Sequence, residues 1–107
     1  MNKVLSLMGF AAKSRNLLTG YNTCSLQIQK NKIKVIILAE DLADNSKEKM
    51  VGLCKREGVK FYEFSTMEEL SHITGKSNSG IFGITDEGFG AAISKEIDSI
   101  QSTKEAE

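Results

Sequence analysis

The residues best suited to bind a ligand lie between Leu17 and Cys24, where an apolar pair is followed by a glycine and a helical pattern then begins. Gly20 and Asn22 are typical of a helix start, where the first backbone N–H groups have no partner within the helix. These N–H groups and the positive end of the helix dipole attract anions such as phosphate. The amide of Asn22 carries both a donor and an acceptor, so it could also hydrogen-bond to a base edge. The stretch therefore predicts either a phosphate-binding helix N-terminus or an ordinary capped junction between a loop and a helix.

The charged residues are distributed unevenly, although 14 basic and 14 acidic side chains give the 107 residues a formal net charge of zero. Residues 40–107 carry eight basic and 14 acidic side chains. Residues 1–39 carry no acidic side chain and six basic ones, Lys3, Lys13, Arg15, Lys30, Lys32 and Lys34. An uncompensated basic segment around a helix N-terminus is typical of a surface that binds a polyanion. Alternatively, the charges lie on solvated faces that neutralise one another in the fold.

Residues suited to catalysis or metal binding are few. His72 is the only histidine, and Cys24 and Cys54 form no Cys-x-x-Cys pair. Gly75-Lys76-Ser77 matches the end of a phosphate-binding P-loop, but the glycine that this motif requires five positions earlier is absent. Glu40 and Asp41 are paired carboxylates, but neighbours on an extended strand point to opposite faces. We therefore expect no enzymatic activity and no cofactor or metal.

Apolar periodicity predicts helices that alternate with strands. Helical spacing is present in five segments, at about 2–14, 22–31, 45–57, 67–74 and 86–101. Strand patterns occupy 17–18, 35–39, 59–64 and 81–85, and the continuous run at 35–39 predicts a strand that is covered on both faces. Asn45 followed by Glu48 resembles a capping box at the start of the third helix, and Thr66 followed by Glu69 indicates a cap at the start of the fourth. This order of elements predicts the α/β class, specifically a three-layer α/β/α sandwich around a small sheet of about four strands.

The length of the chain suits one domain with a single core. We expect this domain to span residues 1–101 and the tail at 102–107 to be frayed. No apolar run approaches the roughly 20 residues of a membrane span, and the first residues lack the pattern of a signal peptide. We therefore expect a cytoplasmic protein with no membrane partner.

Several short stretches together match a known family in order and spacing, namely 7–13 with 17–20, 34–41, 69–70 with 75–76, and 84–90. Through them the chain resembles the small bacterial YlxQ-like branch of the kink-turn-binding ribosomal proteins, whose archaeal member is called L-seven-Ae. The resemblance implies an α/β/α sandwich that binds sharply bent RNA containing tandem sheared G·A pairs. The expected function is therefore non-enzymatic binding of structured RNA, either ribosomal RNA or another kink-turn RNA, with ribosomal or translation proteins as further partners.

In this family a Gly-x-Asn-Glu-x-x-Lys run at the second helix contacts the G·A pairs. By position, Gly20 and Asn22 match this run, whereas Thr23 replaces its glutamate and Leu26 replaces its lysine. Leu26 is expected on the exposed face of the helix, opposite a buried face that carries Cys24. An exposed leucine at that place favours an alternative function, a protein-interaction module of the translation or transcription machinery without specific kink-turn readout.

The family also uses an apolar loop after the strand that corresponds to residues 61–64, where it covers an extruded base. In the helix that follows, Ser71 replaces a usual glycine. Taken together, the resemblance and the charge pattern predict that RNA contacts come from Lys13, Arg15, Gly20, Tyr21, Asn22, Thr23, Leu26, Lys30, Lys32, Lys34, Glu40, Asp41, Phe64, Leu70, Ser71 and His72.

Overall fold

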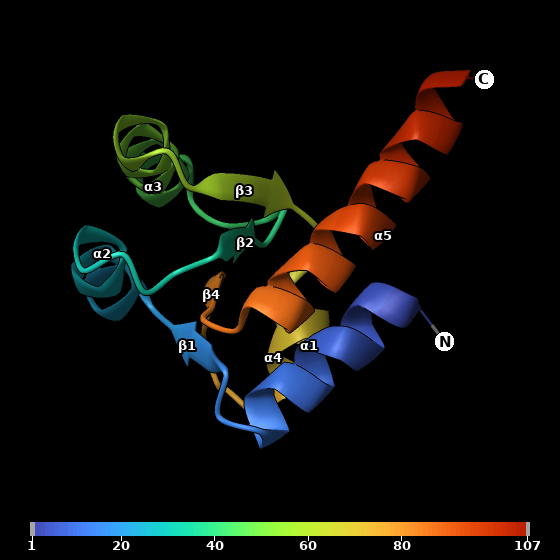
Figure 1. The fold of residues 1–107 in the computed structure, drawn as a ribbon, viewed down its shortest axis with the longest axis horizontal. Coiled ribbons are helices and arrows are strands. Elements are labelled where there is room, and N and C mark those ends of the chain that lie inside the picture. Colours follow the sequence, from blue (N-terminus) through green and yellow to red (C-terminus); the bar gives the residue numbers. More distant parts are fainter. Residues whose placement is uncertain (1, 107) are drawn as a thin grey trace.

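The alternating helical and strand patterns fold into three layers in the computed structural model, which describes residues 2–106, with side chains up to residue 101 (Figure 1). Within these residues, four strands form one mixed sheet that is covered by five helices. The elements are α1 (Lys3–Lys13), β1 (Leu17–Thr19), α2 (Tyr21–Gln29), β2 (Val35–Leu38), α3 (Asp44–Glu57), β3 (Lys60–Glu63), α4 (Met67–Thr74), β4 (Ile81–Ile84) and α5 (Glu87–Ala106).

The two faces of the sheet carry separate apolar cores, because successive strand residues point to opposite sides. On one face, α2 and α3 pack their buried side chains, including Cys24, Ile28 and Met50, against Ile36 and Leu38 of β2. On the other face, α1, α4 and α5 pack against Val35, Ile37 and Phe82 (Figure 1). All four residues of β2 are buried, as the continuous apolar run predicts. The structure thus confirms the predicted α/β/α sandwich.

The strand order β1-β4-β2-β3 gives the sheet two chemically different ends. β4 runs antiparallel to both β1 and β2, whereas β2 and β3 are parallel. One end, which we call the Gly20 end, holds the junctions β1–α2, β2–α3, β3–α4 and α4–β4, at residues 20–22, 39–44, 63–67 and 75–80. The other, the Lys34 end, holds the junctions α1–β1, α2–β2, α3–β3 and β4–α5, at residues 13–16, 30–34, 55–60 and 85–87.

Only α4 has the predicted boundaries, and α1 is one residue shorter at each end because Asn2 and Ser14 are its caps. α2 begins at Tyr21, one residue before the predicted start. The predicted capping box at Asn45 is wrong, because α3 begins at Asp44 after Ala43 and has no side-chain cap; the Asp44 carboxylate instead lies in the first turn, where the helix dipole favours it. α5 continues to Ala106 and includes most of the segment 102–107, whose last residue lies outside the described residues. The domain limit at residue 101 stays a prediction.

Candidate nucleic-acid interface

The N-terminus of α2 is open to solvent at the Gly20 end. Gly20 occupies the N-cap position with φ 92° and ψ 152°, and no side chain caps the helix. A Cβ at Gly20 would meet no atom within 4 Å, so it is the positive φ that favours glycine here. The first turn holds the half-buried Tyr21 and the exposed Asn22 and Thr23, while Cys24 is the first residue whose N–H bonds within the helix, to the Gly20 carbonyl at 3.1 Å. The first-turn N–H groups are therefore available to an anion or a base edge.

The sheet holds α2 rigidly in this position. The Gly20 N–H donates to the Ile81 carbonyl at 3.0 Å, which ties the start of α2 to the central strand β4. Farther along the helix, Cys24 and Ile28 are buried against the sheet. Leu26 is 50% exposed, which confirms its predicted place on the outer face of α2. The helix therefore presents Asn22, Thr23 and Leu26 to solvent from a fixed scaffold.

Both cysteines are packing residues beneath this site. Burial raises the pKa of the Cys24 thiol to about 12, with a smaller contribution from Cys54, whose own pKa burial raises to about 11. Their thiols stay protonated and unreactive at neutral pH. Among the described residues, no group of three His, Cys, Asp or Glu side chains could hold a metal ion, and no helix is both long enough and apolar enough to cross a membrane.

The β3–α4 junction also lies at the Gly20 end, and here Asp41 serves the fold. Its Oδ1 accepts a hydrogen bond from the Met67 N–H at 2.8 Å, and Thr66 Oγ1 accepts one from the Glu69 N–H at 3.2 Å. These two caps fix the start of α4, as the Thr66-x-x-Glu69 pattern indicates. A surface hollow of about 600 Å³ beside them is lined by Asp41, Met67, Glu68, Ser71, His72, Ser77 and Asn78.

The remaining predicted contacts at this end differ in their access to solvent. Glu40 and His72 are exposed, and Ser71 is half-buried, with its Oγ donating to the Ser79 carbonyl at 3.3 Å. Phe64 is half-buried and packs against the core. Leu70 is fully buried, so its side chain packs inside the molecule and does not reach a ligand at the surface. This side of the site thus offers Ser71 and His72, with part of Phe64.

The basic residues of the first third do not surround the N-terminus of α2, contrary to the predicted arrangement. Lys13, Arg15, Lys30, Lys32 and Lys34 all belong to the Lys34 end. The reason is that β2 carries the chain from one end of the sheet to the other, and the six steps from Lys34 to Glu40 span about 20 Å at the rise of a strand. Lys34 and Glu40, which are close in the sequence, are therefore separated by the length of a strand.

The structure adds three cations to the Lys34 end that the sequence analysis did not include, Lys55, Arg56 and Lys60. They follow from the parallel pairing of β2 and β3, which places Val35 beside Lys60. The eight cations in the four junctions of this end face three acids, Glu57, Asp86 and Glu87. The junctions of the Gly20 end hold one cation, Lys76, and four acids, Glu40, Asp41, Asp44 and Glu63, of which Glu63 forms an ion pair with Lys47. The molecule is therefore polarised along the strand direction.

The fold is that of a known family. Residues 2–94 match the Ribosomal protein L7Ae/L30e/S12e/Gadd45 family, and the chain belongs to this family. It is 30% identical over 87 residues to the RNA-binding protein YlxQ of Enterococcus faecium, which covers 81% of this chain and 84% of that protein. It is 25% identical over 83 residues to the RNA-binding protein YlxQ of Bacillus subtilis (strain 168), covering 78% and 83%. These similarities confirm the predicted membership in the YlxQ-like branch.

Two solved structures share the fold. A protein of unknown function from Bacillus halodurans superimposes with a TM-score of 0.88 at 28% identity, over 92% of this chain and 99% of that one. The 15.5 kD RNA binding protein of Giardia lamblia superimposes with a TM-score of 0.75 at 19% identity, over 92% and 84%. The second similarity concerns the fold alone.

Proposed function

We propose that this chain is a non-enzymatic RNA-binding protein that recognises structured, kink-turn-like RNA with its Gly20 end. The observation that carries the proposal is the uncapped N-terminus of α2, which presents the exposed Asn22 and Thr23 beside free backbone donors. Family membership and the two relatives named RNA-binding protein YlxQ support RNA as the ligand. Ribosomal RNA and other RNAs with a sharp bend are the expected partners.

Each exposed group at the start of α2 has a distinct role in this proposal. The N–H groups of the first turn donate to a phosphate or to a base made accessible by the bend. The Asn22 amide reads a base edge through one donor and one acceptor, and the Thr23 hydroxyl adds a further hydrogen bond. Leu26 covers a sugar or base with apolar surface. Ser71 and His72 approach the RNA from the neighbouring α4.

The acids at the Gly20 end favour recognition by shape. Glu40 and Asp44 are exposed, and Glu63 is held by an ion pair with Lys47 at 2.8 Å. Because regular RNA brings phosphates of both strands to any surface it meets, these carboxylates disfavour docking of an undistorted duplex here. A bent RNA that presents unpaired bases to α2 brings fewer phosphates close to these carboxylates, so repulsion reduces its binding free energy less.

The test is a titration of the protein with a kink-turn RNA and with the same RNA after its G·A pairs are replaced by Watson–Crick pairs. We expect the wild type to prefer the kink-turn RNA at two salt concentrations. Asn22→Ala should weaken kink-turn binding by about tenfold, because a base-edge pair discriminates by about 1–3 kcal/mol. Gln29→Ala, an exposed change at the far end of the same helix, is the matched control. Equal binding of both RNAs, unaffected by Asn22→Ala, would contradict recognition by the Gly20 end.

The exposure of two large apolar side chains favours a second candidate, a protein-interaction module. Leu26 is 50% exposed on α2, and Phe10 is 58% exposed on α1 at the other face of the sheet. Because the two do not form one contiguous patch, each would serve a separate protein contact. Under this alternative, the protein binds neither RNA of the titration, and its partners remain bound in a pull-down from nuclease-treated lysate. Partners that disappear after nuclease treatment would support the RNA-binding function instead.

A further inference from the structure

The cations of the Lys34 end form a row across the ends of the four strands. The Thr85 N–H donates to the Asn16 carbonyl at 3.0 Å, which places Arg15 beside the end of β4. The Lys34 N–H donates to the Ile84 carbonyl at 2.7 Å, and Val35 pairs with Lys60. With strands about 4.8 Å apart, Arg15, Lys34 and Lys60 span about 15 Å across the four strands. Cations spread over this distance suit an extended polyanion better than a single small anion.

Within the part of the chain that the structure describes, none of these cations forms a salt bridge. Among the described residues the structure forms two salt bridges, Lys3–Glu96 and Lys47–Glu63, and both lie outside the Lys34 end. Of the three acids near the row, Asp86 is engaged by the Phe89 N–H at 2.8 Å, where it caps α5. The unpaired excess of positive charge is therefore available to an external anion.

Stabilisation of helix ends explains only part of this charge. Lysine and arginine near a helix C-terminus interact favourably with the helix dipole, and Lys13, Lys55 and Arg56 lie in last turns. Arg15, Lys32, Lys34 and Lys60 lie beyond the helix ends, on turns or strand starts. In the described part of the chain, neither a helix end nor a salt bridge accounts for the charges of these four residues.

The turns that carry the row are fixed by hydrogen bonds. At the end of α1, the Arg15 N–H donates to the Ala12 carbonyl and the Asn16 N–H to the Ala11 carbonyl, at 3.2 and 2.8 Å. The end of α2 repeats the pattern, with Asn31 donating to Ile28 and Lys32 to Gln27, at 3.0 and 2.9 Å. Both are Schellman motifs, whose left-handed position usually holds glycine. Arg15 and Asn31 occupy it here with φ of 64° and 59°.

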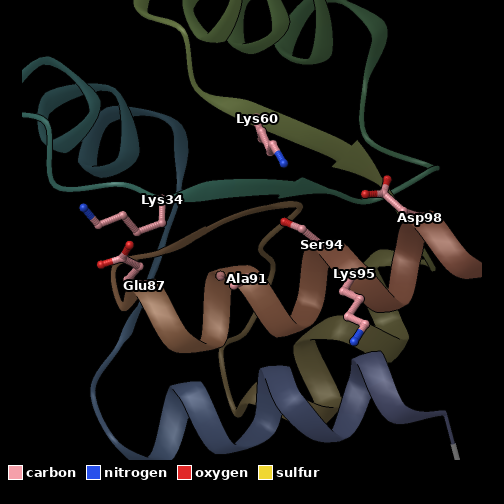
Figure 2. Close-up of a pocket in the computed structure, with 8 residues that line it drawn as sticks. Lys34, Lys60, Glu87, Ala91, Ser94, Lys95 and Asp98 are labelled. Atoms are coloured by element: carbon pink, nitrogen blue, oxygen red, sulfur yellow. The ribbon is translucent and has the colours of Figure 1, made fainter.

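A groove of about 500 Å³ between the sheet edge and α5 shows from which side an anion would approach. In Figure 2, Lys34 and Lys60 line it from the side of the sheet, whereas Glu87, Ser94, Lys95 and Asp98 line it from α5. The two carboxylates of α5 outnumber Lys95 and disfavour entry of a phosphate along this helix. A phosphate meets no carboxylate if it approaches across the ends of the strands, over Arg15, Lys34 and Lys60.

From this geometry we infer that the Lys34 end is a second RNA-binding surface, which binds the phosphate backbone without reading its sequence. One protein molecule then contacts RNA at both ends of its sheet: the Gly20 end recognises the bend, and the Lys34 end holds a flanking or neighbouring helix. The inference rests on the proposed function for the identity of the polyanion, but its residues are separate from those of the Gly20 end.

The salt dependence of binding tests the inference, because each phosphate contact contributes about 0.9 to the slope of log K against log salt concentration in duplex DNA. The double variant Lys34→Gln, Lys60→Gln should reduce this slope by up to about 2 and weaken binding of both a kink-turn RNA and a regular RNA duplex. The matched control is Lys3→Gln with Lys49→Gln, which removes the same charge from exposed positions that lie outside the row and outside the Gly20 end junctions.

The outcomes separate the two ideas. The inference is supported if the slope falls in the Lys34, Lys60 variant and not in the control, while the preference for kink-turn RNA is retained. It is overturned if the wild type binds kink-turn RNA and both double variants have its slope. If the wild type binds both RNAs equally and the slope falls only in the Lys34, Lys60 variant, the inference stands and recognition by the Gly20 end fails. Absence of binding to either RNA overturns both.

Discussion

Arg15 illustrates how one side chain can serve binding at a cost to stability. Its φ of 64° lies in the left-handed region, which costs an ordinary residue about 1–2 kcal/mol. The equivalent positions after α3 and α4 are glycines, Gly58 and Gly75. The guanidinium forms no salt bridge in the described structure, so packing gives no reason for arginine at this site. Binding of an external anion would explain the arginine at this position.

We predict that Arg15→Gly stabilises the protein and weakens RNA binding. The free energy of unfolding should rise by about 0.5–1 kcal/mol, because the relief of backbone strain exceeds the extra freedom of glycine in the unfolded chain. The slope of log K against log salt should fall by about 1. Urea denaturation and RNA titration measure the two effects. Asn31→Gly changes the matching position of α2 without changing charge, and it should leave the slope intact; an equal loss in both variants would refute the role of the guanidinium.

The buried cysteines give a prediction about pH. Burial raises the pKa of Cys24 to about 12 and that of Cys54 to about 11, from 9.0. Their contribution to stability is therefore complete below pH 9, and it is lost as the pH rises through about 11 for Cys54 and about 12 for Cys24, since the unfolded chain ionises first. The native protein at pH 8 should react with a thiol reagent much more slowly than the urea-unfolded protein. Rapid labelling of two thiols in the folded state would show that they are not packed as described.

At the scale of the elements, α4 depends on a contact that sequence analysis assigned to RNA. The Asp41 carboxylate caps α4 through the Met67 N–H at 2.8 Å. We predict that Asp41→Ala lowers the free energy of unfolding by about 1 kcal/mol, the usual effect of losing a helix cap. Its RNA affinity should match that of the wild type when measured on folded protein. The neighbouring exposed carboxylate provides the control, Glu40→Ala, which should leave stability within about 0.5 kcal/mol.

The seating of α2 depends on Gly83 in the central strand β4. A Cβ there would lie 2.7 Å from Ile33 Cδ1 and 3.1 Å from Cys24 Sγ, so the buried Ile33 side chain would have to repack and Cys24 would have to give way slightly. Gly83→Ala should therefore destabilise the protein by about 1–3 kcal/mol. Gly52→Ala, in α3, meets only Arg56 Nη1 at 3.8 Å and should be neutral or stabilising by up to about 1 kcal/mol. Denaturation of both variants checks the contrast, and equal stability of the two would contradict the close packing at Gly83.

Single elements were largely predictable because their signals are local. The β-branched run at 35–39 is a buried strand, and Thr66 caps α4 through Glu69. The capping box predicted at Asn45 was wrong because Asp44 and Asn45 are both typical capping residues, and in the structure α3 already begins at Asp44. The prediction that Leu70 contacts RNA was wrong for another reason. Its position in the family motif does not indicate which face of the helix is buried, and in the structure the Leu70 side chain lies in the core.

At the scale of the whole molecule, charge separation was not predictable from residue order. The sequence places six cations before residue 40, close to the predicted helix N-terminus. The insertion of β4 between β1 and β2, and the parallel pairing of β2 with β3, instead collect the cations at one end and Glu40, Asp41, Asp44 and Glu63 at the other. Strand order arises from long-range pairing, which a local pattern does not encode. The same pairing is what adds Lys60 to the row.

The central claim is that the start of α2 is the RNA-reading surface. The most direct measurement is the change in backbone amide NMR shifts when a kink-turn RNA is added to the ¹⁵N-labelled protein. The account predicts the largest changes at Tyr21, Asn22 and Thr23, with further changes around Lys34 at the opposite end. Buried amides of β2 should move little, because the scaffold is rigid. Changes confined to the Lys34 end, with the α2 amides unmoved, would contradict the claim.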